Sequence, residues 1–345
     1  MVQIVANFQG EAVQAQQVLI VSPAGARENN GNWQTASRWA DILRAHYQVA
    51  IGRSADYDAD SPPAMPSADL LIALHARRSA AAMAAFAHTW PDRPRILVLT
   101  GTDLYRDIHH DPSARAALEQ ATDLVLLQAA GLAVLPPGLK ARTHVIHQSA
   151  PAMQAQHTGT QQMAVCMIGH LRREKDPLTF MRASALVRNR AVRLLHIGRA
   201  LEPALGEAAS ATAHAQANYQ WLGDLPHPAT RAVLATSHAM AICSHMEGGA
   251  NVIIEAVTSG VPVLASDING NRGMLGEDYA GYFAAGDAAA LAALIDRSVD
   301  DPAFHARLRA QCAARAPLFA PATEGAAVLA LVDGALQPAL PPAIR

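Results

Sequence analysis

Two glutamates, Glu247 and Glu255, are the residues of this sequence whose type and spacing most clearly suggest chemistry. Seven residues separate them within 244–267 (SHMEGGANVIIEAVTSGVPVLASD), where a predicted strand runs through a Glu-Gly-Gly turn into a predicted helix. On the turn, Glu247 could hold sugar hydroxyls near a reacting carbon. About a turn and a half into the helix, Glu255 could accept hydrogen bonds from ribose hydroxyls. The pair therefore favours a ligand that carries both a ribose and a sugar.

The turn between these glutamates could also bind an anion. Gly248 and Gly249 let the backbone approach a ligand closely. The N–H groups that open the helix, from Ala250 and Asn251 to Val252, present a positive end that suits a diphosphate. The alternative is an ordinary glycine turn with a capping carboxylate. Because predicted strands flank the turn, we favour the binding interpretation.

A second turn, 168–177 (IGHLRREKDP), carries three cations after another predicted strand. Arg172, Arg173 and Lys175 precede a helix that Pro177 starts, and they could face the same diphosphate. There they could neutralise charge as a nucleotide leaves. A solvated basic turn is the alternative. The position of the turn at the carboxyl end of a strand favours the functional interpretation.

Turns in the first half of the chain offer groups for an anionic acceptor. In 23–33 (PAGARENNGNW), backbone N–H groups could reach a phosphate, and in 75–79 (HARRS) and 100–106 (TGTDLYR) arginines supply the cations that a small polyanion needs. Asp103 could orient an arginine or cap the next helix, and His75 could touch a donor sugar or be a structural histidine. The candidates are Gly31, Asn32, His75, Arg77, Arg78, Thr100, Thr102, Asp103 and Arg106.

All these turns follow short apolar runs, which alternate with longer alanine-rich stretches of helical spacing. This alternation is typical of parallel α/β domains. The runs are 18–22, 47–51, 69–74, 95–99, 124–128 and 143–147, then, after the polar segment 149–162, 164–168, 193–197, 219–222, 240–244 and 262–266. The doubling predicts two doubly wound domains, with the site in the cleft that the carboxyl ends of their strands face.

We expect domains at 1–150 and 160–316. The remaining segment, 317–345, is rich in proline and alanine. It is expected to form a helix near 323–336 and a tail, and to pack back towards the linker.

Composition and charge exclude several classes of protein. The 345 residues are 51% hydrophobic and 16% charged, which is a globular profile. With 27 Lys+Arg against 29 Asp+Glu, the net charge of −2 gives no reason to expect nucleic acid. No run approaches about eighteen uncharged apolar residues, so neither a membrane span nor a membrane partner is expected. The N-terminus lacks the features of a signal peptide, and the three cysteines have no CxxC spacing, which predicts a reduced, cytoplasmic protein.

Common cofactor and metal motifs are missing from the sequence. Neither GxGxxG nor GxxxxGK[ST] occurs after a predicted strand. Asp56, Asp58 and Asp60 resemble a metal-binding DxD pattern, but they lie in a polar segment that we interpret as a solvated loop. The histidines show no HExxH or other ligand spacing. We expect no metal and no cofactor.

The two turns in the second half, with 221–224 (WLGD) between them, resemble those of GT-B glycosyltransferases of family four. The resemblance covers about 163–285, with the E-x7-E pattern at Glu247 and Glu255, the phosphate loop at Gly169 and Lys175, and the base loop at 222–225. It implies two Rossmann-like domains that face a central cleft, with a nucleotide-activated sugar bound in the C-terminal domain and no metal.

Carried onto this sequence, the resemblance assigns catalytic roles to Lys175, Arg172 and Glu247. Donor-binding roles fall to Gly169, His170, Arg173, Leu222, Gly223, Gly248, Gly249, Ala250, Asn251 and Glu255. Three positions depart from the family pattern: His170 stands where an arginine is common, Thr100 where a histidine is usual, and Met274 near a usual glutamate. The second cation must then come from Arg172 or Arg173, and the changes suit an unusual acceptor.

Four stretches are similar to the selenosugar synthases of selenoneine biosynthesis: 101–107 (GTDLYRD), 169–177 (GHLRREKDP), 246–256 (MEGGANVIIEA) and 267–283 (DINGNRGMLGEDYAGYF). This resemblance implies transfer of a hexosyl group, typically N-acetylglucosaminyl, from UDP-GlcNAc or UDP-glucose to the selenium of selenophosphate. The N-terminal domain would present the acceptor, and no protein nucleophile is needed.

Other functions remain open at this stage. A conventional family-four hexosyltransferase would use a hydroxyl acceptor, and a nucleotide-sugar epimerase would turn over without any acceptor. A non-catalytic protein would bind the nucleotide sugar only. The preferred hexose, the anomeric outcome, the oligomeric state, domain closure and the identity of the acceptor-binding arginine are not determined by the sequence.

Overall fold

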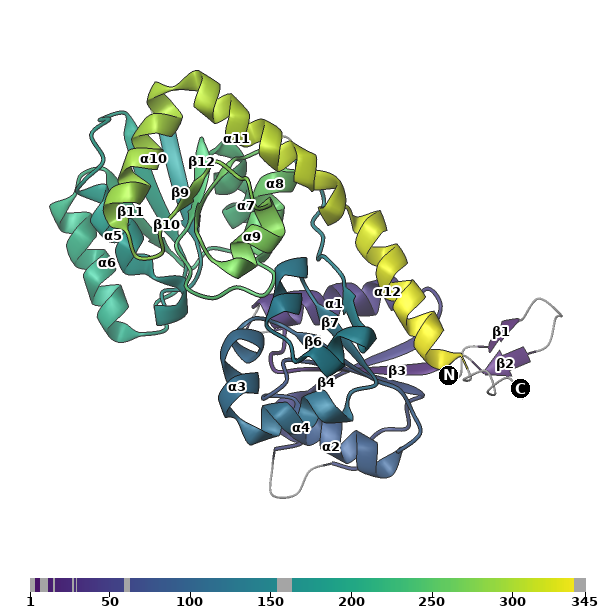
Figure 1. Cartoon of the computed structure of the whole chain (residues 1–345). Helices are drawn as coiled ribbons and strands as arrows, with labels where there is room; N and C mark the ends of the chain where they lie inside the picture. The colour runs from purple at the N-terminus through teal and green to yellow at the C-terminus, as the bar shows by residue number, and fades with distance from the viewer. Residues whose placement is uncertain are drawn as a thin grey trace. The chain divides into compact units, whose positions relative to one another are not determined.

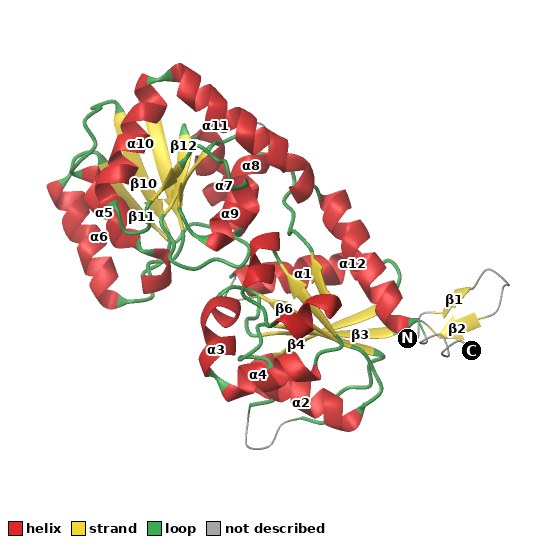
Figure 2. Ribbon diagram, in the orientation of Figure 1, coloured by secondary structure: helices red, strands yellow, loops and turns green. Residues whose placement is uncertain are grey.

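The computed structural model describes residues 4–6, 12–14, 16–26, 28, 30–58, 63–153 and 163–337. The chain divides into two compact units, one formed by Met1–His147 with Ala322–Arg345 and the other by Gln148–Pro321. Each unit contains a six-stranded parallel sheet with helices (Figure 1, Figure 2). This confirms the predicted α/β class with two doubly wound domains. The last helix belongs to the first unit.

The sheet of the first unit has the strand order β4-β3-β5-β6-β7-β8. Its strands are β3 (Gln17–Ser22), β4 (Gln48–Arg53), β5 (Leu70–Leu74), β6 (Arg95–Leu99), β7 (Asp123–Leu126) and β8 (Thr143–Val145). A short antiparallel pair, β1 (Ile4–Ala6) and β2 (Ala12–Gln14), precedes them. The α-helices are α1 (Gly31–Leu43), α2 (Ala80–Thr89), α3 (Ile108–His110), α4 (Pro112–Gln120) and α12 (Pro321–Leu336). Shorter turns are η1 (Ser54–Asp56), the π-helical η2 (Asp103–Asp107), η3 (Ala129–Ala133) and η4 (Pro137–Arg142).

Alternate residues of the same strands build two separate cores on the two faces of this sheet. Leu19 and Val21 pack with residues of α2 and α4, whereas Val18 and Ile20 pack with residues of α1 and α12. The separation follows from the two-residue period of a strand, which points successive side chains to opposite faces. The first unit is therefore covered by helices on both faces.

Helix α12 joins the first unit through its own apolar and polar contacts. Val328 and Val332 are fully buried in the core that contains α1. Glu324, which is 1% exposed, accepts hydrogen bonds from Arg38 Nε at 2.6 Å and from Trp39 Nε1 at 2.8 Å. The expected helix near 323–336 is confirmed, and the structure groups it with the N-terminal strands. The tail beyond Gln337 lies outside the described residues.

The sheet of the second unit has the order β11-β10-β9-β12-β13-β14. Its strands are β9 (Met163–Ile168), β10 (Val192–Ile197), β11 (Tyr219–Gly223), β12 (Ala239–Ile242), β13 (Val263–Ser266) and β14 (Tyr282–Phe283). The helices are η5 (Arg173–Lys175), α5 (Pro177–Ser184), α6 (Pro203–Ala215), α7 (His227–Thr236), α8 (Asn251–Thr258), α9 (Asn269–Leu275), α10 (Ala288–Asp300), α11 (Pro302–Arg315) and η6 (Ala316–Phe319). The sequence analysis did not predict β14, because two residues are too few to show periodicity.

Three helices start at an Asp-Pro pair, and the contacts of this pair show why a helix begins there. Asp111, Asp176 and Asp301 cap α4, α5 and α11 by accepting hydrogen bonds from backbone N–H groups of the first turn. The proline that follows occupies the first helical position, where its missing N–H costs nothing. One of these caps, Asp176, adopts a left-handed backbone with φ of 43°.

One continuous helical stretch, Pro302–Leu336, is long and apolar enough to cross a membrane, judged by length and composition alone. The expectation from the sequence concerned runs of uncharged apolar residues, whereas an 18-residue window of high mean hydropathy tolerates up to two charges. The two criteria differ, so this stretch does not contradict the absence of a long uncharged run. In the structure the stretch consists of α11, η6 and α12, and 28% of that window is buried inside the protein.

A buried histidine in the second unit predicts a pH dependence of stability. His196 on β10 is fully buried, with Nδ1 2.8 Å from Tyr219 Oη, and burial lowers its pKa to about 4. The unfolded chain takes up this proton near pH 6.5, so folding becomes less favourable as the pH falls from 6.5 towards 4. Each unit of pKa difference corresponds to about 1.4 kcal/mol.

We expect the free energy of unfolding of His196→Leu to depend less on pH between 4.5 and 6.5 than that of the wild-type protein. Urea denaturation at several pH values, followed by tryptophan fluorescence, measures the two slopes. His214→Leu, on the exposed surface of α6, should keep the wild-type slope. Equal slopes for wild type and His196→Leu would contradict the assignment.

Candidate functional site

The predicted donor-binding turns meet at the point where the strand order of the second sheet reverses. Strands β10 and β11 lie on one side of β9, and β12 and β13 lie on the other. In open parallel sheets, ligands bind beyond the carboxyl ends of the strands at such a point. The turn with Lys175 follows β9 and the turn with Glu247 follows β12, and these two strands are paired.

Lys175 and Glu247 form an ion pair at this position. Lys175 Nζ lies 2.5 Å from Glu247 Oε1, although the two are 72 positions apart in the chain. The lysine side chain crosses Gly169, where an added Cβ would lie 3.7 Å from its Cγ and Cδ. The side chains are 18% and 9% exposed. The structure thus brings together a cation and a carboxylate that the sequence placed in separate turns.

Backbone contacts fix the turn of Glu247 from both sides. Gly270 of α9 packs so closely that an added Cβ would lie 2.0 Å from the carbonyl oxygen of Glu247. On the other side, His245 N–H donates to the carbonyl oxygen of Glu174 at 2.9 Å, and His245 Nε2 lies 3.5 Å from Asp176 Oδ2. These contacts join the turn after β12 to η5 and the start of α5. Neither Gly270 nor His245 was among the residues predicted from the sequence.

A second glycine packs against the turn after β9. Gly198, at the end of β10, has φ of +149°, and an added Cβ there would lie 2.0 Å from Gly169 O and 2.9 Å from His170 Cα. A side chain at Gly198 would push this turn away from its place beside Glu247. A glycine directly after a predicted strand is the signal in the sequence that could have identified this position.

The remaining residues of the phosphate-loop prediction have varied environments. His170 Nδ1 accepts a hydrogen bond from Arg199 N–H at 3.2 Å. Burial lowers the pKa of His170; Asp224 opposes this shift, and nearby cations add to it. At physiological pH its imidazole is therefore neutral. Arg172 is half-buried and Arg173 is exposed, while Arg173 N–H donates to Glu202 Oε1 at 2.6 Å.

Glu255 lies on α8 and contacts a residue that the sequence analysis missed. Its Oε1 is 2.7 Å from Nε2 of His227, the first residue of α7. The glutamate side chain is 12% exposed and the histidine side chain is 44% exposed. Leu222 and Gly223 end β11 shortly before this helix, and Gly223 adopts φ of +69°. The structure therefore places the predicted base loop and the predicted ribose-binding carboxylate in one neighbourhood.

The N-terminus of α8 has no side-chain cap. Ala250 occupies the cap position and has no group that could accept a hydrogen bond from the first turn. The first N–H groups of a helix lack partners within the helix and carry a partial positive charge. The turn through Gly248 and Gly249, together with Asn251 at the start of α8, is therefore suited to an anionic ligand.

In the first unit, Asp103 holds two turns together. Its carboxylate is fully buried and accepts hydrogen bonds from the N–H groups of Ala76, Thr100 and Gly101 at 2.8–2.9 Å. Asp103 therefore neither orients Arg106 nor caps the next helix, the two roles considered for it; it joins the turn after β5 to the turn after β6. Arg106 is oriented by a different carboxylate, Asp107, which the sequence analysis did not consider.

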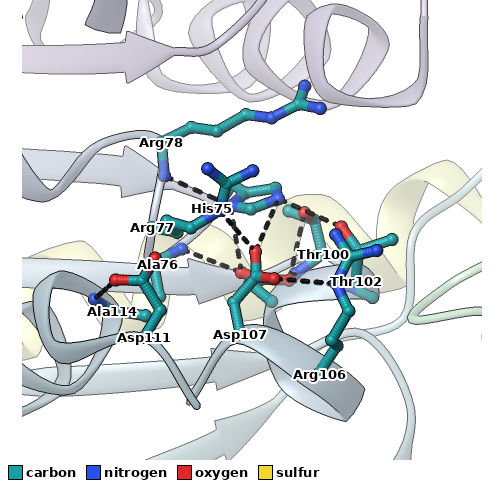
Figure 3. Close-up of polar contacts among 12 residues, drawn as sticks. His75, Ala76, Arg77, Arg78, Thr100, Thr102, Arg106, Asp107, Asp111 and Ala114 are labelled. Atoms are coloured by element: carbon teal, nitrogen blue, oxygen red, sulfur yellow. Dashed lines mark hydrogen bonds and ion pairs between the residues drawn. The ribbon is translucent and has the colours of Figure 1, made fainter. Parts of the chain in front are cut away.

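Asp107 bridges two of the predicted acceptor-binding arginines (Figure 3). Its Oδ1 accepts from Arg106 Nε and its Oδ2 accepts from Arg77 Nε, both at 2.9 Å. Burial opposes ionisation of Asp107, but these hydrogen bonds outweigh it and lower its pKa. The arginine side chains are 41% and 45% exposed, whereas that of Asp107 is 7% exposed.

His75 lies beside this cluster in a backbone conformation that is rare for residues other than glycine. It has φ of +71° and is 2% exposed. Its Nε2 lies 3.1 Å from Thr102 Oγ1, and its Nδ1 accepts from Arg78 N–H at 3.4 Å (Figure 3). Burial lowers the pKa of His75, although Asp103 and Asp107 act in the opposite direction. Strained backbones of this kind occur often at functional sites.

The loop before α1 differs from expectation. Asn30 caps the helix, and its Oδ1 accepts from the N–H groups of Asn32 and Trp33 at 3.1 and 3.3 Å. Asparagine is strongly preferred at the cap position that Asn30 occupies. The N–H of Asn32 therefore donates to the Asn30 side chain and does not face an anion in this structure. Gly31 is the first residue of the helix.

Among the described residues, no group of three or more His, Cys, Asp or Glu side chains is arranged to hold a metal ion. Asp56 belongs to η1, whereas Asp60 of the DxD-like pattern lies outside the described residues. The buried thiols of Cys166, Cys243 and Cys312 are free.

A comparison with protein families gives a match in the second unit. Residues 151–317 match the model of the family described as glycosyl transferases group 1. A search of curated protein sequences gave no match.

Solved structures of similar fold cover nearly the whole chain. HepE from Anabaena, in complex with UDP and glucose, has a TM-score of 0.73 at 16% identity, over 92% of this chain and 100% of that chain. Sucrose-phosphate synthase from Thermosynechococcus elongatus has a TM-score of 0.75 at 15% identity, over 92% and 98%. A glycosyltransferase from Rickettsia africae has a TM-score of 0.71 at 16% identity, over 94% and 99%. Residues 151–317 thus carry the glycosyl transferases group 1 signature, and the chain is a glycosyltransferase with the GT-B fold.

Proposed function

We propose that the chain transfers a hexosyl group, N-acetylglucosaminyl in the first instance, from a UDP-sugar to the selenium of selenophosphate. The donor would be UDP-GlcNAc or UDP-glucose. The observation that carries the donor part is the meeting of Lys175 and Glu247 at the switch point of the second sheet. The similar fold of HepE, whose structure contains UDP and glucose, supports the same donor class. The selenium acceptor rests on the sequence resemblance and on the arginines of the first unit.

On the donor side, the diphosphate would lie between Lys175 and the uncapped start of α8. Lys175 Nζ supplies a full positive charge, and the N–H groups near Ala250 supply a partial one. Glu247 would exchange its bond to Lys175 for hydroxyls of the sugar. Glu255 would bind ribose hydroxyls through the carboxylate oxygen that does not contact His227.

On the acceptor side, arginines after β5 and within η2 would bind the phosphate oxygens of selenophosphate. Guanidinium groups recognise such oxyanions through paired, charge-assisted hydrogen bonds. Arg77 and Arg106 are both close to half-exposed while their Nε atoms are held by Asp107. This supports a small, highly charged acceptor more than a neutral sugar hydroxyl.

The reaction needs no nucleophile from the protein. A lone pair of selenium would form the bond to the anomeric carbon as the bond from that carbon to the diphosphate oxygen breaks, and UDP leaves with the electron pair. Lys175 and Arg172 would stabilise the charge that develops on the leaving diphosphate, and the two units would contribute by positioning their substrates. We propose that this transfer is metal-independent and takes place in the cytoplasm.

The proposal is tested by incubating the purified protein anaerobically with UDP-GlcNAc or UDP-glucose, with and without selenophosphate, and analysing products by mass spectrometry. Formation, only with selenophosphate, of the Se-hexosyl selenophosphate, or of the seleno-hexose and phosphate left when water cleaves its P–Se bond, supports it. Transfer to sugar or lipid hydroxyls instead would favour a conventional hexosyltransferase. Conversion of the UDP-sugar in the absence of an acceptor would favour an epimerase. Binding of UDP-sugar without any product would favour a nucleotide-sugar-binding protein.

We expect Lys175→Ala to lower turnover about 10²- to 10³-fold, because the leaving diphosphate loses its charged partner. Product formation at saturating UDP-sugar measures the effect, and circular dichroism checks the fold. Lys140→Ala provides a matched control, since Lys140 is an exposed lysine of η4 in the other unit. Activity of Lys175→Ala near the wild-type level would contradict the role assigned to Lys175.

We expect Gly270→Ala to lower turnover about tenfold to a hundredfold, because its methyl group would displace the backbone of Glu247. Gly325→Ala in α12 is the control, since an added Cβ there meets nothing within 4 Å. Steady-state kinetics of both variants would show the difference. Equal activity of the two would mean that the turn of Glu247 does not need its present position.

A further inference from the structure

We propose that Asp107 is a positioning residue that holds Arg77 and Arg106 together as one binding site for a small tetrahedral oxyanion. This inference rests on the proposed function, because it concerns the acceptor side of that reaction. Asp107 was not among the site residues predicted from the sequence. Its carboxylate would allow two arginines from different turns to bind one ligand.

The geometry of the carboxylate carries the inference. Each of its two oxygens accepts one hydrogen bond, Oδ1 from Arg106 and Oδ2 from Arg77, both at 2.9 Å (Figure 3). Arg77 follows β5, whereas Arg106 and Asp107 belong to η2. A single buried carboxylate thus fixes the relative position of two guanidinium groups that lie in separate turns of the sheet edge.

The way in which the arginines engage Asp107 keeps them suited to a second ligand. A guanidinium group can form paired hydrogen bonds through the edge with Nε or through the edge with its two terminal nitrogens. Both arginines use Nε towards Asp107, which leaves the terminal edge of Arg77 directed away from the carboxylate. Because the side chains are 41% and 45% exposed, an ion from solution can reach them.

The carboxylates around the cluster are engaged by groups of the protein, whereas its arginines are partly exposed. Three arginines, Arg77, Arg78 and Arg106, lie with three carboxylates, Asp103, Asp107 and Asp111. Asp103 accepts hydrogen bonds from three backbone N–H groups, and Asp111 accepts from two at the start of α4. His75 adds no positive charge near neutral pH, because burial lowers its pKa. An anion would therefore meet the exposed guanidinium groups of Arg77 and Arg106.

Two roles of Asp107 predict opposite effects of its removal. If its negative charge only opposed the ligand, Asp107→Asn would strengthen anion binding, because the site would become more positive. If Asp107 positions the arginines, the same variant would weaken binding, since an asparagine amide offers one acceptor oxygen in place of two and its NH₂ group repels a guanidinium. The direction of the change therefore separates the two.

The test uses the full chain and inorganic phosphate as the probe, measured by isothermal titration calorimetry without UDP-sugar. We expect Asp107→Asn, Arg77→Ala and Arg106→Ala each to weaken phosphate binding about tenfold, and Asp107→Glu to restore part of the affinity. Lys175→Ala should retain the phosphate site that Arg77→Ala and Arg106→Ala weaken, which distinguishes this site from any phosphate bound at the donor turns.

Asp111→Asn is the matched control. Asp111 caps α4 close to the cluster, and its replacement removes a nearby negative charge without removing a hydrogen bond to either arginine. Thermal denaturation of each variant checks that the fold persists. Unchanged or tighter phosphate binding by Asp107→Asn, or binding that only Lys175→Ala abolishes, would overturn the inference.

Failure of the proposed function gives a different result. If the protein binds phosphate through Arg77 and Arg106 but forms no seleno-hexose, the acceptor reaction is wrong and the role of Asp107 stands. If seleno-hexose forms, the positioning role further requires that Asp107→Asn raise KM for selenophosphate and leave KM for the UDP-sugar unchanged. An equal rise in both would indicate a general structural effect and overturn the inference.

Discussion

The pairing of β9 with β12 is the constraint on which the donor site depends. These strands are far apart in sequence but adjacent at the point where the strand order reverses. Adjacency places the turn after β9 next to the turn after β12, so that Lys175 and Glu247 can form their ion pair. A charged pair that is largely removed from water is favourable only with good geometry, which this arrangement of the two turns provides. The topology therefore decides which turns can cooperate.

The two units stabilise their functional turns by different means. In the second unit, glycines allow backbone segments to approach one another: Gly270 packs on Glu247, and Gly198 packs on Gly169. In the first unit, buried carboxylates hold the turns in place: Asp103 accepts hydrogen bonds from backbone N–H groups, and Asp107 accepts them from arginines. Close backbone packing suits a turn that surrounds a ligand, whereas a carboxylate can orient long cationic side chains.

The strained backbone of His75 fits this division. A left-handed conformation at a residue with a side chain is unfavourable unless the surroundings impose it. Here the N–H of the next residue, Ala76, donates to the buried Asp103, and the imidazole contacts Thr102. The turn after β5 is thus held in one shape, which directs Arg77 towards Asp107. Rigid placement of this kind reduces the conformational entropy that a side chain loses when a ligand binds.

Local sequence determined the strands of both parallel sheets except β14, the α/β class and the turns that carry the candidate site residues. The alternation of apolar runs with helical stretches, and the residues Lys175, Glu247 and Glu255 at or after strand ends, can be read without a structure, because these patterns follow from the periods of strands and helices. Only the tertiary structure decided which partners meet. The contacts of Lys175 with Glu247, of His227 with Glu255, and of Asp107 with two arginines depend on strand order and on side-chain packing between distant segments. No local pattern encodes such contacts, which explains why Asp107 and Gly270 went unpredicted and why Asn30 proved to cap a helix through the N–H groups expected to bind an anion.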